Sequence, residues 1–242
     1  MKNLIVFLTL TFFSGSLLSH NNPVPEKSNR VYAHSGLKLR IEPSTHSEVI
    51  KVIPYGDRVT VLETHDEQQR IEWMNGNWVK VAYDNTEGYI FGGFISDLPM
   101  PKMDFELTSD DLDVTYPLIS WAEHNFDEIR QSDTLMVDGL HRLTQHMENG
   151  ITLVRRDTKY DFTVILTLPE TEIEEAYNLV KSILLTKPER VTFNNKSIFV
   201  ANNVGDIHRI KVQVDDPIEL RKMKDGSVKI LVTSFHHGCD VF

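Results

Sequence analysis

Short runs of alternating apolar and polar residues, separated by turn residues, fill the chain from about residue 30 to residue 98. Leu37, Leu39 and Ile41 fall on one face of a strand because side chains alternate with period two. Asn75-Gly76 lies between two such runs, and this dipeptide is the strongest short-range signal for a hairpin turn. The predicted strands cover residues 37–41, 49–53, 59–62, 71–74, 78–83 and 87–91. So many short strands close together predict a small β-barrel, because closure removes exposed sheet edges.

The pattern changes after Val114 and mixes the periods of helices and strands. Apolar residues from Leu118 to Ile129 recur at helical spacing after Pro117, which favours a first helical turn. A second helix is predicted after Thr171, because Thr171 and Glu174 have the spacing of a capping box and an amphipathic stripe follows. The predicted strands cover residues 151–155, 162–168, 191–193, 197–201, 208–214 and 228–235, the last preceded by the turn signal Asp225-Gly226. This order predicts an α+β domain with a mostly antiparallel sheet.

These patterns divide the chain into five segments. Residues 1–19 have the basic start, the apolar run and the small residues of a secretory signal peptide, and the apolar run is too short to span a bilayer. We therefore expect an exported protein, periplasmic or secreted, without membrane insertion after removal of the signal. Two polar stretches containing proline, 20–29 and 99–113, are predicted linkers. The first linker precedes the predicted barrel at 30–98. The second linker joins the barrel to the α+β domain at 114–242.

The charge balance narrows the classes of partner. The chain has 25 Lys and Arg against 35 Asp and Glu, a formal net charge of −10. This balance argues against nucleic acid as a general partner, since phosphates need a basic surface. It also argues against electrostatic docking on anionic lipid, while leaving room for a local basic patch.

No complete catalytic or metal-binding motif is found in the sequence, so we predict no catalytic residue, no metal and no cofactor. The only cysteine, Cys239, follows every histidine and has no helix after it that would activate a thiolate. His236 and His237 are adjacent on a predicted strand end and point to opposite faces, so they do not readily share one ion. Whether Cys239 is reactive stays open. The linker acids Asp110, Asp111 and Asp113 are not followed by the glycine at position six and the closing glutamate of an EF-hand calcium loop.

Aromatic residues are concentrated in the predicted barrel. Tyrosine and tryptophan combine a large contact area with a polar group, which suits peptides and sugars. Some of these residues must fill the small core, and others are available to a ligand. The residues that we expect to contact a ligand are Tyr55, Trp78, Tyr89 and Phe91.

Residues 30–98 resemble a bacterial SH3 domain. The motifs that carry the resemblance are, in order, Leu37-Lys38-Leu39-Arg40 with Pro43-Ser44-Thr45, Val49-Ile50, Gly56, Asn77-Trp78-Val79-Lys80-Val81, Gly88-Tyr89-Ile90 and Phe94-Ile95. The sequence departs from the family pattern at Lys38, where asparagine is usual, and at Tyr89, where tryptophan is usual. No resemblance is found for residues 114–242.

The resemblance implies a small exported β-barrel that binds murein or its peptide stems. The leading hypothesis is a non-enzymatic binding protein of the bacterial cell envelope, with murein or an envelope peptide or protein as ligand. Two alternatives stay open. One is a cell-wall hydrolase whose site lies in the C-terminal domain, and the other is a scaffold for protein–protein interaction.

Overall fold

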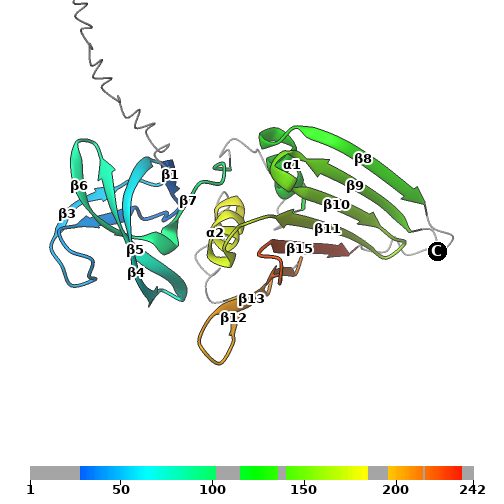
Figure 1. Cartoon of the computed structure of the whole chain (residues 1–242). Coiled ribbons are helices and arrows are strands. Elements are labelled where there is room, and N and C mark those ends of the chain that lie inside the picture. Colours follow the sequence, from blue (N-terminus) through cyan, green and yellow to red (C-terminus); the bar gives the residue numbers. More distant parts are fainter. Residues whose placement is uncertain (1–27, 102–114, 136–139, 185–195, 215, 236–242) are drawn as a thin grey trace, which may run out of the picture.

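The computed structural model describes residues 28–101, 115–135, 140–184, 196–214 and 216–235. Several predicted features lie outside these residues, namely the signal peptide, most of the second linker with its acids, the strand 191–193, and Cys239 with His236 and His237. The described residues form two antiparallel sheets and two α-helices, which confirms a mainly β and α+β fold (Figure 1).

The first sheet curls around its own apolar core. Its strands are β1 (Ser28–Val31), β2 (Leu37–Arg40), β3 (Val49–Ile53), β4 (Arg58–Ile71), β5 (Met74–Tyr83), β6 (Thr86–Phe91) and β7 (Ile95–Ser96), with the 3-10 turn η1 (Gly92–Phe94) before β7. They are ordered β3-β2-β6-β5-β4-β1-β7. Leu37 and Leu39 are buried in the core as expected, whereas Ile41 follows the end of β2 and is exposed. We call this unit the barrel.

The predicted turn at Asn75-Gly76 is wrong. The chain reverses three residues earlier, at Glu72 and Trp73, which both have positive φ, and Ile71 pairs with Met74. Asn75 and Gly76 lie inside β5. The glycine serves another purpose there, because a Cβ on Gly76 would lie 2.5 Å from the backbone nitrogen of Gly93 in η1. The glycine of Asn75-Gly76 therefore permits a close approach of two backbone segments and does not form a turn.

The second sheet has eight strands in the order β12-β13-β14-β15-β11-β10-β9-β8. The strands are β8 (Glu128–Leu135), β9 (His141–Met147), β10 (Thr152–Asp157), β11 (Asp161–Leu168), β12 (Ser197–Ala201), β13 (Ile207–Val212), β14 (Ile218–Lys222) and β15 (Val228–Phe235). The 3-10 turn η2 (Glu148–Gly150) links β9 to β10. The helices α1 (Thr115–Asn125) and α2 (Ile173–Leu184) pack on the same face of this sheet.

Four predicted strands of this sheet are confirmed as β10, β11, β12 and β15, and the stretch 208–214 corresponds to β13. Asp225-Gly226 forms the expected turn, with Gly226 at φ 83°. The helical period through Ile129 is wrong at its end, because α1 stops at Asn125 and Ile129 belongs to β8. Asn125 Nδ2 donates to the Trp121 carbonyl at 2.7 Å and helps to end the helix. Strands β8, β9 and β14 are not among the predicted strands. In β8, polar residues occupy both faces and obscure the alternation.

The helix α2 begins close to the predicted place but with a different cap. Glu175 accepts a hydrogen bond from the backbone N–H of Glu172 at 3.0 Å, which is half of a capping box one residue later than expected. Glu174, the residue predicted for that role, points instead to the barrel and accepts the backbone N–H of Asn75 at 3.3 Å.

Candidate ligand-binding site

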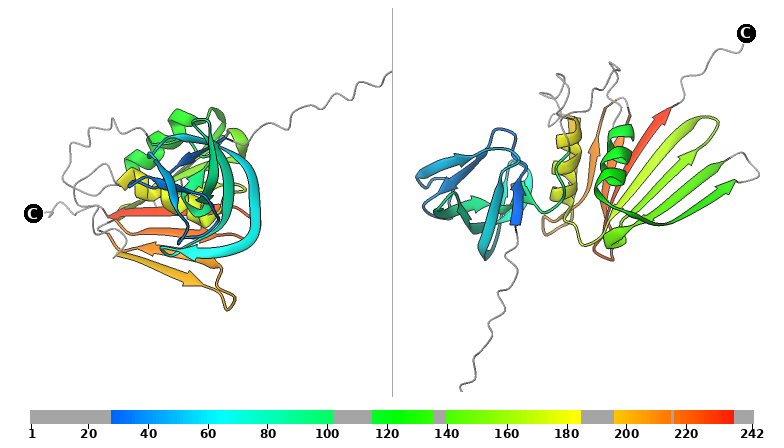
Figure 2. Two further views of the ribbon diagram at one scale, coloured as in Figure 1. Left: turned by 90° about the vertical axis from the view of Figure 1, so that its left-hand side faces the viewer. Right: turned by 90° about the horizontal axis from the view of Figure 1, so that it is seen from above.

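Helix α2 lies between the barrel and the second sheet in Figure 1 and in the right-hand view of Figure 2. Its sheet-facing residues and four barrel residues, Tyr32, Met74, Trp78 and Phe91, belong to one continuous apolar cluster. On the barrel side of the helix, Asn178 Nδ2 donates to the Gly93 carbonyl at 2.9 Å, and both groups are buried. The barrel and the α+β domain therefore share part of their core.

The chain that leaves the barrel is held on both sides. The Tyr32 hydroxyl donates to the carbonyls of Leu98 and Pro99 at 3.1 and 3.0 Å. Trp121 of α1 donates its indole N–H to the same Pro99 carbonyl at 2.8 Å. Burial raises the pKa of Tyr32, so its hydroxyl stays protonated and remains a donor. These bonds fix the barrel relative to α1.

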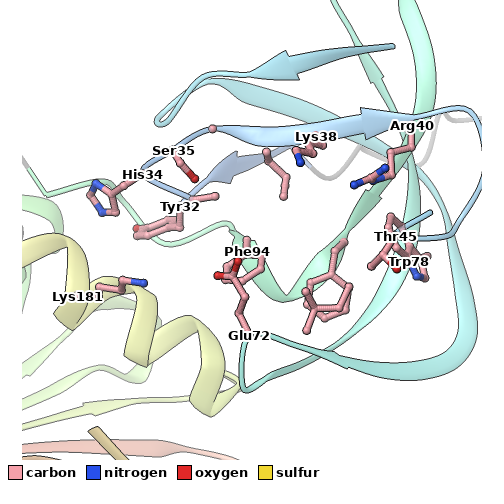
Figure 3. A pocket seen from close by; sticks show the side chains of 15 residues that line it. Tyr32, His34, Ser35, Lys38, Arg40, Thr45, Glu72, Trp78, Phe94 and Lys181 are labelled. Carbon is pink, nitrogen blue, oxygen red and sulfur yellow. The ribbon is translucent and has the colours of Figure 1, made fainter. Parts of the chain in front are cut away.

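A cavity of about 460 Å³ opens where the barrel meets α2 (Figure 3). Aromatic side chains form much of its wall: Tyr32, Trp78, Phe91 and Phe94. Trp78 and Phe91 meet edge to face, with ring centroids 6.1 Å apart. The Trp78 indole N–H is already used, since it donates to Gln69 Oε1 at 2.9 Å. A ligand would therefore meet the rings as apolar surface and not as hydrogen-bond donors.

Positive groups surround this aromatic wall. Lys38 and Arg40 reach it from β2, and Lys181 reaches it from α2, as Figure 3 shows. Glu72, at the β4–β5 turn, is the one carboxylate in the lining. Burial lowers the pKa of Lys181, and the charge of Glu72 opposes that effect. The cavity thus combines an apolar wall with an excess of cationic groups, which suits an anionic ligand with apolar side chains.

The structure brings two of the four predicted residues together in this cavity. Trp78 and Phe91 line it, although each is 3% exposed and also supports the core. Tyr55 lies outside it and stacks on His34, with ring centroids 4.1 Å apart, and His34 is part of the lining. Tyr89 is half-buried and meets the edge of His65 at 5.4 Å; it does not line the cavity, although its cross-strand partner Arg40 does. Contact of all four with a ligand stays a prediction.

Sequence reasoning missed Tyr32, Phe94 and the three cations of the lining. Lys38 was noted only as a departure from the family pattern. Lys181 is more than 80 residues from the last barrel strand, and its helical position showed only that it was on the polar side of α2. No local signal in the sequence marks it as part of a site in the barrel.

Other candidate chemistry is sparse in the part of the chain that the structure describes. There, no group of three or more His, Cys, Asp or Glu side chains is arranged to hold a metal ion. His141 lies 2.6 Å from Asp133 in an exposed pair. Among the described helices, none has the length and apolar character needed to cross a bilayer.

A second cavity, of about 500 Å³, is lined by residues of the barrel and of the first turn of α2. Its lining includes Glu172, Glu174 and Glu175 together with Gly76 and Gly93. The two cavities differ in charge and in aromatic content, and the predicted ligand residues Trp78 and Phe91 line only the first. We therefore take the first cavity as the candidate site.

Comparison with known proteins agrees with the architecture of the barrel. The family model of the bacterial SH3 domain matches residues 35–96, and residues after the barrel match no family. The curated proteins and the solved structures gave no match to the chain. The matched range contains β2 to β7 and, with them, Trp78, Phe91, Lys38 and Arg40 of the cavity. Residues 35–96 of this chain are a bacterial SH3 domain.

Proposed function

We propose that this protein is an exported, non-enzymatic binding protein of the bacterial cell envelope, which binds murein or an envelope peptide at the cavity between barrel and α2. The observation that carries the proposal is this cavity, whose aromatic wall belongs to a bacterial SH3 domain and whose rim carries Lys38, Arg40 and Lys181. Export is supported by the signal-like residues 1–19.

The chemistry of the cavity favours an acidic peptide over a neutral sugar. Lysine and arginine form charge-assisted hydrogen bonds with carboxylates, which are about twice as strong as neutral ones. The murein stem is a peptide with free carboxylates, so it offers both the charge and the short apolar side chains that such a cavity accepts. The aromatic wall would then exclude water from the ion pairs and strengthen them.

Co-sedimentation of the full chain with isolated murein sacculi tests the proposal. The double variant Lys38→Gln/Lys181→Gln is expected to lower the affinity about tenfold, since two partly exposed charged contacts contribute roughly 1 kcal/mol or less each. The matched control is Lys51→Gln, on the same barrel but outside the cavity. Tyr89→Ala should leave binding unchanged if the cavity alone is the site.

Three results would count against the proposal. Sacculi that fail to retain the full chain exclude murein as the ligand. Equal losses in the control and in the double variant indicate a general charge effect. Loss of binding in Tyr89→Ala alone would move the site from the cavity to the neighbouring surface around Tyr89 and His65.

A further inference from the structure

One face of the second sheet is covered by no described helix or strand. Helices α1 and α2 both pack on the face that carries Val228, Ile230 and Val232, and they lie on the barrel side of the sheet (Figure 2). Because side chains alternate along a strand, the residues between these point to the opposite face. On that face Val154 is buried at 7% exposure, and Ile165 and Leu231 are half-buried. All three are absent from the apolar clusters of the core, in agreement with the alternation. We call it the outer face.

The strand register gathers positive charge on the outer face. Arg209, Arg221 and Lys229 lie directly beside one another on β13, β14 and β15. Arg156 and Arg142 are paired in the same way on β10 and β9. Neighbouring strands are about 4.8 Å apart, so each set forms a row of closely spaced cations.

Two further cations extend these rows across the sheet. In the strand register, Lys211 of β13 lies opposite Glu219 of β14. Arg130 of the edge strand β8 lies opposite His146 of β9. The rows therefore reach from β13 to β8. Between them lie threonine hydroxyls, including those of Thr144, Thr152 and Thr167, which register with the same rows.

Negative charge hardly offsets this concentration. Among the described strand residues of the outer face the acids are Glu219 and, at the end of β11, Asp161. Glu219 is paired with Arg209, with N–O separation 2.5 Å, and with Arg221. Burial opposes its ionisation, but the hydrogen bonds from these two arginines bring the pKa of Glu219 down to about 2.

The other five cations of the outer face form no ion pair with any described acid. Four of them, Arg130, Arg142, Arg156 and Lys211, are exposed. The chain as a whole has a net charge of −10, so a face with this excess of cations stands apart from the rest of the molecule. Like charges in adjacent register destabilise a sheet unless an anion lies over them. The arrangement therefore fits an anionic partner.

The shape of the face favours a flexible partner over a flat one. Adjacent strands in a sheet are rotated by about 20°, so the expected twist over the six steps from β13 to β8 is roughly 120°. Figure 1 shows β12 and β13 running in a different direction from β8 to β10. A flat bilayer can touch only part of such a surface, whereas a flexible polymer can follow the rows.

The residue types favour phosphate as the anion. Five of the seven cations are arginines, whose planar guanidinium groups bind phosphate oxygens in pairs. The threonine hydroxyls between them can donate to the same oxygens. From these observations we propose that the outer face of the second sheet binds a flexible phosphate-bearing polymer, at a site separate from the cavity in the barrel.

Binding of the full chain to inorganic polyphosphate of defined length tests this proposal directly, with the dissociation constant measured over a range of salt concentrations. The test variant is Arg142→Gln/Arg156→Gln, which neutralises one pair on the outer face. We expect the slope of log K against log salt to fall by about 1.4, since each phosphate contact contributes about 0.7 in a single-stranded polyanion. The affinity at low salt should fall several-fold.

The matched control is Lys51→Gln/Arg58→Gln, which removes two positive charges from the barrel. Glu219→Gln provides an opposite test, because it frees Arg209 and Arg221 for phosphate and should tighten binding. Circular dichroism verifies that each variant is folded.

Several outcomes would overturn the proposal. One is no binding of polyphosphate by the full chain at low salt, and another is an equal loss in the control. Tighter binding to anionic vesicles than to polyphosphate would indicate a membrane surface, and much tighter binding to single-stranded DNA of equal charge would indicate recognition of bases. Murein binding at the cavity is measured separately, so failure of either proposal leaves the other standing.

Discussion

Glu174 shows how one side chain takes part in joining the two domains. It is buried at the first turn of α2 and accepts the backbone N–H of Asn75, in the strand that follows the β4–β5 turn. Burial raises the pKa of its carboxyl group to about 7, partly offset by its backbone hydrogen bonds. Nearby charges act in both directions, because Glu172 raises this pKa and Lys222 lowers it. The contact between the domains therefore includes a group that titrates near neutral pH.

The stability of the protein should decrease as the pH rises through this range. The folded state holds the Glu174 proton more tightly than the unfolded state, whose carboxyl has a pKa near 4.5. The stabilising contribution is thus complete below pH 4.5 and is lost as the pH rises through about 7, by at most about 3 kcal/mol. Glu174→Gln keeps the acceptor and has no charge, so its free energy of unfolding should lack this decrease.

Urea denaturation of both proteins at several values of pH between 5 and 8 measures the difference. Glu170→Gln, at an exposed carboxylate before the helix, is the control and should follow the parent protein. Parallel curves for parent and Glu174→Gln would show that Glu174 is already ionised at pH 5.

At the scale of elements, the β4–β5 hairpin forms a bridge to the second sheet. Its turn residues Glu72 and Trp73 have positive φ, a conformation that favours asparagine and glycine. Trp73 lies against Phe199 of β12, with ring centroids 6.4 Å apart and planes at 13°. Arg70 of the same hairpin donates to the carbonyl of Gly205. The turn thus has residues that rarely adopt positive φ, and both Trp73 and Arg70 contact the other domain.

A double-mutant cycle measures the contact between Trp73 and Phe199. We compare Trp73→Gly, Phe199→Leu and the double variant by denaturant unfolding, since glycine also tolerates the positive φ. A coupling free energy of about 0.5 to 1.5 kcal/mol is expected for a stacked aromatic pair. Additive effects of the two substitutions would show that the pair contributes nothing across the contact.

The same elements show what the sequence can and cannot predict. The strands β2, β3 and β6, the hairpin of β10 and β11, and the stripe of α2 follow from local period and turn residues. The turn at Glu72 does not, because its conformation depends on contacts with residues more than 100 positions away. The cavity is half predictable: Trp78 and Phe91 belong to the barrel pattern, whereas Lys181 joins them only through packing of α2. Asn178 lies outside the apolar stripe of α2 and is nevertheless buried, because it bonds to Gly93 of the barrel.

At the scale of the whole molecule, the two domains behave as partners in one core. The apolar cluster runs from Trp78 and Phe91 in the barrel through α2 to the second sheet. Hydrogen bonds from Asn178 to Gly93 and from Trp121 to Pro99 also join the two parts. We therefore expect the described parts of the chain to unfold together.

Replacement of Asn178 by alanine tests this coupling. It leaves the buried carbonyl of Gly93 without its donor, which costs about 1 to 3 kcal/mol. Hydrogen–deuterium exchange should then rise both in β5 with η1 and in α2, if the domains open as one unit. Asn203→Ala, at an exposed position, is the control. Faster exchange confined to α2 would show that the barrel is stable by itself.

The shared core has a consequence for the newly made chain. The last strand of the barrel ends at Ser96, and α2 starts at Ile173. During synthesis the barrel segment is complete long before the helix that covers Met74, Trp78 and Phe91 exists. The nascent chain then exposes an aromatic flank, which is the kind of surface that chaperones bind and that aggregates when left open. A chain truncated before α2 is thus expected to be insoluble or chaperone-bound, and its ligand cavity would lack one wall.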